Sequence, residues 1–168
     1  MEPTIQLKQS INRIKDIFKD NALTDDTKKA RVNEQVSLLF DFREMSKLML
    51  RRYWDVSAPA RQNAFVEAFS GFLGRVYFPH LDKLKDANIT YLSESTGIYK
   101  SELVIQVQTK DTYEITIFMH MVNGIWKIYD MELMGISIAH NYGEQFRRIL
   151  RQKSFDDLIR DIGEKKTK

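Results

Sequence analysis

The chain has 168 residues, a net charge of +3 and no cysteine. Hydrophobic residues make up 43% and charged residues 29%, which is ordinary for a globular protein with one domain and a real core. The missing cysteines exclude disulfides and thiolate chemistry, and no run of about 18 apolar residues predicts a transmembrane helix.

The first half of the chain has the apolar spacing of helices. It predicts helices over residues 4–19, over 25–39 with Thr24 as the cap, and over 42–53. A longer helix follows over 59–79, with a proline at each end, and we expect the second proline to end or kink it.

Beyond residue 88 the spacing of apolar residues changes from a period of 3.6 residues, typical of a helix, to a period of 2, typical of a strand. Residues 89–94 predict a short strand, and alternation continues over 102–108 and 113–121. Asn123-Gly124 is a strong signal for a two-residue hairpin. Residues 89–134 therefore predict an antiparallel meander with one apolar face.

The segment 124–146 joins the last long strand to a helix. The strand breaks at Gly135, and Ser137 is a candidate N-cap before apolar residues at helical spacing. A final helix is predicted to open at Ser154. The segment has no nucleophile paired with a base, no metal-ligand cluster and no phosphate loop, which favours binding over catalysis.

The predicted architecture is α+β, with helices packed on the concave face of a curved antiparallel sheet of about four strands. We expect one domain over residues 1–168, helical over 4–84, a meander over 89–134 and helical again over 137–163. A cone of this kind commonly encloses a cavity, so an internal apolar cavity is expected.

The polar residues do not predict catalysis or a metal site. The three histidines lie on different elements without a second ligand at helical spacing: His80, His120 and His140. Asp130 and Glu132 share one face of a strand, but a structural carboxylate near the strand end is the better interpretation. Ser137 lacks the glycine elbow of a nucleophile. We therefore predict no enzyme activity, no metal and no cofactor.

The positive charge is too small and too scattered to predict a nucleic-acid surface. Arg147, Arg148, Arg151 and Lys153 mark the outer face and end of a helix, and they favour docking on an anionic membrane or an acidic partner. Three further lysines are predicted to lie in a frayed tail: Lys165, Lys166 and Lys168.

Ordered short motifs over residues 4–162 resemble the MlaC family, also called the toluene-tolerance auxiliary family. The motifs are Phe40-Asp41-Phe42, Met45-Ser46, Leu50-Arg51-Arg52-Tyr53-Trp54, Pro59, Arg61-Gln62, Phe65, Phe69, Val76-Tyr77, Gly124-Ile125-Trp126-Lys127-Ile128-Tyr129-Asp130, Gly135-Ile136-Ser137, Asn141-Tyr142 and Gln145-Phe146.

Two positions depart from the family pattern. Arg51 stands where the family usually has Gly, which we interpret as an adjusted helix surface. Gly143 stands where Arg commonly follows Asn-Tyr, which removes a charge near the expected cavity mouth.

The resemblance implies a soluble periplasmic phospholipid carrier of the Mla lipid-trafficking system, with its signal peptide removed and acting as a monomer. Its implied partners are phospholipid, an outer-membrane lipoprotein–porin complex and an inner-membrane ABC transporter with its lipid-binding subunit. Burial contributes about 0.8 kcal/mol per CH₂, so a sixteen-carbon tail contributes on the order of 12 kcal/mol. A neutral hydrogen bond contributes only about 1 kcal/mol, so the tails should dominate affinity.

The predicted lipid-binding residues are apolar side chains of the helices and of the inward face of the sheet. They are Phe42, Met45, Met49, Phe65, Phe69, Phe72, Leu73, Val76, Tyr77, Leu103, Ile105, Val107, Ile115, Ile117, Met119, Ile128, Met131, Leu133 and Ile136. Patterning alone favours an ordinary core for this set. The alternatives that remain open are a binding protein for another hydrophobic small molecule and an interaction protein with a closed core.

Overall fold

The computed structural model describes residues 1–164, so the three tail lysines lie outside the described residues. The chain forms two compact units, each built from two separate stretches. Unit 1 comprises Met1–Asp41 and His80–Gly135. Unit 2 comprises Phe42–Pro79 and the stretch that begins at Ile136. The single domain expected over residues 1–168 stays a prediction.

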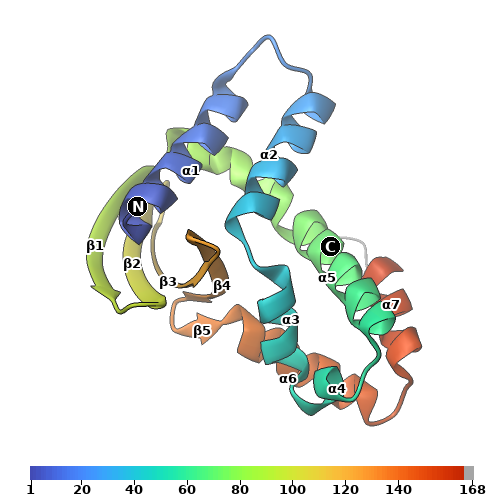
Figure 1. Ribbon diagram of the computed structural model, residues 1–168. Coiled ribbons are helices and arrows are strands. Elements are labelled where there is room, and N and C mark those ends of the chain that lie inside the picture. The colour runs from blue at the N-terminus through green and yellow to red at the C-terminus, as the bar shows by residue number, and fades with distance from the viewer. Residues whose placement is uncertain (165–168) are drawn as a thin grey trace. The chain divides into compact units, whose positions relative to one another are not determined.

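Unit 1 opens with two helices joined by a short turn (Figure 1). They are α1 (Pro3–Lys19) and α2 (Asp25–Leu39), close to the predicted bounds. The Thr24 hydroxyl accepts the backbone N–H of Thr27 at 3.2 Å, which confirms the predicted cap. A short 3₁₀ helix, η1 (Asp82–Asp86), leads into the sheet.

The sheet of unit 1 is an antiparallel meander of β1 (Asn88–Thr96), β2 (Lys100–Gln108), β3 (Thr112–Val122) and β4 (Ile125–Leu133). The strands bend strongly in Figure 1. The β1–β2 register shifts between Tyr91 and Ser93, and the β3–β4 register shifts between Phe118 and Met119. Such irregularities bend a strand and increase its twist, which accounts for part of the curvature.

The turns of the sheet follow the local chemistry of the sequence. Asn123 and Gly124 both have positive φ, 51° and 81°, as a type I′ hairpin requires, and the predicted hairpin is confirmed. A two-residue strand, β5 (Ile136–Ser137), completes a strand order of β1-β2-β3-β4-β5. The sheet therefore has five strands, one more than expected.

One face of the sheet forms the core of unit 1. Alternate residues of β2 are buried, and across the register Leu103 lies opposite Ile117 and Ile105 opposite Ile115. Leu7 from α1 and Leu39 from α2 are buried in the same cluster. The helices of unit 1 thus cover the sheet with aliphatic side chains.

Part of the edge of β4 makes polar contacts with the N-terminal half of the chain. The side-chain amide of Gln6 accepts the Trp126 N–H at 3.0 Å and donates to the Trp126 carbonyl. Two residues further along, Asp41 N–H donates to the Ile128 carbonyl at 2.8 Å. These bonds satisfy backbone groups that an open strand edge would leave available for aggregation.

Unit 2 is helical, and it differs from the sequence prediction at two points. The helix predicted over 42–53 is wrong, because Arg51 (φ 50°, ψ −122°) separates α3 (Phe42–Leu50) from α4 (Arg52–Asp55). Next, α5 (Pro59–Leu81) continues past Pro79, so the proline does not end the helix, and the alternative of a kink there stays a prediction. The missing N–H of Pro79 removes one helical hydrogen bond near the end, where the loss is small.

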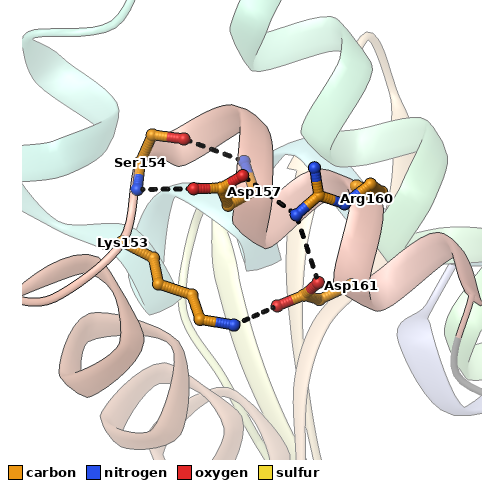
Figure 2. A network of polar contacts seen from close by, with 5 residues as sticks. All are labelled: Lys153, Ser154, Asp157, Arg160 and Asp161. Carbon is orange, nitrogen blue, oxygen red and sulfur yellow. Dashed lines mark hydrogen bonds and ion pairs between the residues drawn. The ribbon is translucent and has the colours of Figure 1, made fainter.

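The last two helices are α6 (Ile138–Leu150) and α7 (Phe155–Glu164), and both begin at a serine cap. Ser137 Oγ accepts the His140 N–H at 3.0 Å, as predicted. At α7, Ser154 Oγ accepts the Asp157 N–H at 3.1 Å, and the Asp157 carboxylate accepts the Ser154 N–H at 3.3 Å (Figure 2). This reciprocal capping pair satisfies two N–H groups at the helix start.

Candidate functional site: the predicted lipid-binding residues

Eight strand residues of the predicted set belong to the hydrophobic core of unit 1. Six of them are nearly inaccessible to solvent, and two more pack against them. The six are Leu103, Ile105, Val107, Ile117, Met119 and Ile128, and the two are Ile115 and Met131. Their side chains therefore stabilise the fold whether or not they contact a ligand.

The three phenylalanines that α5 contributes to the predicted set belong to an aromatic cluster in unit 2. Phe65 and Phe69 are fully buried and lie stacked with ring centroids 6.0 Å apart. Both rings meet Phe146 of α6 edge-on, at 5.9 and 6.0 Å. Phe72 meets Tyr142 edge-on at 5.4 Å. Edge-to-face pairs of this kind each contribute about 0.5–1.5 kcal/mol beyond their buried area.

The predicted set omits the partners that α6 and α7 supply to this cluster. Tyr142 and Phe146 lie one turn apart on α6, and Phe155 of α7 meets Phe65 at 5.8 Å. Their helical spacing is visible in the sequence, but nothing in it shows that they meet α5. Phe65 and Phe69 are thus enclosed by aromatic rings of their own unit.

Burial is the main cause that raises the pKa of Tyr142, and a hydrogen bond with Tyr77 raises that pKa further. Tyr77 is a predicted lipid-binding residue and is half-buried on α5, as is Val76. Leu73 is buried. The aromatic cluster thus includes a hydrogen-bonded pair of tyrosine side chains, Tyr142 and Tyr77.

The predicted residues of α3 lie where this helix packs against α6. Met45 and Met49 are fully buried, and Phe42 is half-buried. A Cβ at Gly143 of α6 would lie 3.0 Å from the Met49 carbonyl oxygen and 3.1 Å from its Cα. Gly143 is therefore a close-approach position, and the expectation that it lies near a cavity mouth stays a prediction.

Two predicted residues remain accessible. Leu133 is 39% exposed and Ile136 is 60% exposed. Between them, Met134 is 69% exposed with a positive φ of 50°, and Gly135 has a φ of 76°. This turn, Leu133–Ile136, presents three large apolar side chains to the exterior, which is the type of surface a hydrophobic ligand can cover.

Three of the polar candidates have structural partners. Asp130 accepts the Met131 N–H at 2.8 Å, His120 pairs with Asp41 at 3.0 Å, and His140 lies 3.6 Å from Glu144. Within residues 1–164, no group of three or more metal-ligating side chains gathers. No helix among these residues is long and apolar enough to cross a bilayer.

The α+β fold is shared with a protein of known structure. The chain is similar to the phospholipid-binding protein from Ralstonia solanacearum, whose structure was solved in complex with a phospholipid. The TM-score is 0.77 at 15% sequence identity, and the match covers 96% of each chain. The chain therefore has the fold of that phospholipid-binding protein.

The family model of the MlaC protein matches residues 8–164. The chain belongs to the MlaC family, and the resemblance drawn from its short motifs is confirmed. No curated protein matches the chain.

Proposed function

We propose that the protein binds phospholipid in the periplasm and carries it between an outer-membrane complex and an inner-membrane ABC transporter. The observation that carries the proposal is the match over 96% of both chains to a protein solved with a phospholipid. Membership of the MlaC family over residues 8–164 supports it. The proposal assigns no catalytic step to the chain.

The apolar side chains of both units supply the chemistry that acyl chains need. A tail contributes about 0.8 kcal/mol for each CH₂ that leaves water, so the ligand is held by contact area more than by polar recognition. Met45, Met49, Met119 and Met131 have flexible thioether side chains that adapt to tails of different length and shape. We assign acyl-chain contact to the predicted set, with Ile136 as its most accessible member.

Transfer of a labelled phospholipid from donor to acceptor vesicles tests the proposal. The wild-type protein should accelerate transfer, and Ile136→Glu should abolish it, because a carboxylate cannot be buried against an acyl chain without a partner. Ile136 is 60% exposed, so this substitution should leave the fold intact.

Ile98→Glu is the matched control. Ile98 is 80% exposed and lies outside the predicted set, so the same charge there should leave transfer unchanged. Equal transfer by the wild type and Ile136→Glu would remove Ile136 from the site. No transfer by the wild type would contradict the carrier function and favour a closed-core interaction protein.

A further inference from the structure

The corner between α3 and α4 gathers positive charge at the surface of unit 2. The segment Lys47–Val56 carries three cations, Lys47, Arg51 and Arg52, against a single carboxylate, Asp55. All three cationic residues are exposed. The corner therefore has a net positive charge.

Arg147 of α6 and Arg151, directly after that helix, add to this charge. The pKa of Arg147 is lowered by burial first, and then by the positive charges of Arg51 and Arg151, while Glu144 opposes the shift. The Arg147 guanidinium donates to the Met49 carbonyl at the end of α3. This bond fixes one cation beside the corner, and the Glu144 carboxylate lies 3.6 Å from His140.

Arg51 occupies a backbone position that favours glycine. Its φ of 50° and ψ of −122° place it in a region that side chains rarely adopt, because Cβ crowds the backbone. Strain of this kind is concentrated at functional sites, where a side chain serves a purpose besides stability. Here the strained residue contributes an exposed cation.

Exposed apolar side chains flank the two arginines. Leu48 is 41% exposed on the last turn of α3, and Val56 is 78% exposed directly after α4. Leu48 precedes Arg52 by four residues and Val56 follows it by four. Cations interleaved with exposed apolar groups are typical of surfaces that bind the head-group layer of a membrane.

We propose that this basic corner, formed by Lys47, Leu48, Arg51, Arg52, Val56 and Arg151, docks on an anionic phospholipid bilayer. Arginine binds lipid phosphates in bidentate fashion, and the apolar side chains enter the interface between them. This docking surface is a separate proposal from phospholipid binding, and it does not require that the protein carries a phospholipid.

Co-sedimentation with vesicles tests the proposal. Vesicles of phosphatidylcholine and phosphatidylglycerol in equal parts should bind the protein, vesicles of phosphatidylcholine alone should not, and added salt should weaken the binding. Arg51→Gly and Arg52→Gln should each weaken binding about fivefold, because each removes one cation from the surface. Arg51→Lys keeps the charge and should keep most of the binding.

Arg31→Gln is the control for net charge, since it removes an exposed cation from α2 of unit 1. It should bind as the wild type does. Failure to bind anionic vesicles would overturn the proposal, as would equal binding to both vesicle types or equal weakening by Arg31→Gln. Capture of an acidic protein without vesicle binding would also overturn it.

The vesicle assay and the transfer assay test the two proposals separately. A protein that transfers phospholipid but does not sediment with anionic vesicles contradicts the docking surface alone. A protein that sediments in a salt-sensitive way but neither transfers nor contains phospholipid contradicts the proposed function alone.

Discussion

Unit 1 and unit 2 build their cores from different side chains. The core of unit 1 is largely aliphatic and comes from alternate positions of paired strands, such as Leu103 opposite Ile117. The core of unit 2 contains an aromatic cluster on three helices, centred on Phe65 and Phe69. β-Branched side chains pack well on the pleated surface of a sheet, while the rings of unit 2 are stabilised further by edge-to-face contacts with one another.

The two cores also differ in what fixes them. Register fixes the strand contacts of unit 1, since a one-residue slip would turn the apolar set outward. Unit 2 depends on close approach between helices, as at Gly143, and on capping at Ser137 and Ser154. The difference predicts that each unit responds to its own substitutions, and four tests address this.

The largest loss of stability is expected when a large side chain in either core is truncated. Phe69→Ala should destabilise the protein by about 3–5 kcal/mol and Ile117→Ala by about 2–5 kcal/mol, because each leaves a cavity. In amide hydrogen exchange by mass spectrometry, Phe69→Ala should accelerate exchange in α5, α6 and α7, and Ile117→Ala in β2, β3 and β4. Equal acceleration everywhere in both variants would show a single cooperative core.

A smaller loss of stability is expected from a substitution where α6 packs against α3. Gly143→Ala should destabilise by about 1–3 kcal/mol, because the added methyl overlaps Met49 backbone that cannot move cheaply. Gly74→Ala on α5 is the control: its Cβ would meet nothing within 4 Å, so the helix should gain about 0.5–1 kcal/mol. Urea unfolding measures both. A neutral Gly143→Ala would mean that the two helices are not in close contact.

Substitution of Arg51 in the α3–α4 corner should instead stabilise the protein. Arg51→Gly relieves the positive φ and should stabilise by about 1 kcal/mol, raising Tm by about 2–4 °C. Arg52→Gly removes the same charge from a helical position and should destabilise by about 1 kcal/mol. If both variants are destabilised alike in thermal unfolding, Arg51 is not strained.

Loss of the α7 cap should lower the stability of the protein by an amount that depends on pH. Ser154→Ala should cost about 1 kcal/mol near neutral pH through the lost cap. Hydrogen bonds from Ser154, with a smaller contribution from Arg160, lower the pKa of Asp157. Its contribution to stability is therefore present above the ordinary pKa of a carboxyl group and is lost as the pH falls through the lowered value.

Circular dichroism of thermal unfolding at a series of acidic pH values tests this sign. Asp157→Asn should unfold with a weaker acid dependence than the wild type, and the exposed Asp16→Asn on α1 should follow the wild type. An unchanged acid dependence in Asp157→Asn would contradict the role of the capping pair.

Local signals in the sequence predicted much of the fold. Thr24, Ser137 and Asn123-Gly124 each act over two or three residues, and the structure confirms all three. The break at Arg51 was not predictable, because apolar spacing continues from Phe42 to Tyr53 and no glycine or proline interrupts it. The division of the chain into two units depends on contacts between residues far apart in the sequence, and no short motif marks it.

The candidate site was predictable only as a set of apolar positions. Periodicity identified Phe65, Phe69 and Ile117 as inward-facing, and the structure buries all three. It did not show which aromatic residues meet, so Phe146 was missed as a partner of Phe69. Core and lining residues share the same pattern because both exclude water, so assignment of the lining to particular residues stays a prediction.

Mass spectrometry of lipid extracted from the purified protein tests the central claim most directly. We expect phospholipid with acyl chains of mixed length, either retained through purification or acquired from vesicles. Another hydrophobic molecule in its place would assign the apolar set to a different ligand. Protein that contains no phospholipid and acquires none from vesicles would contradict the proposed function.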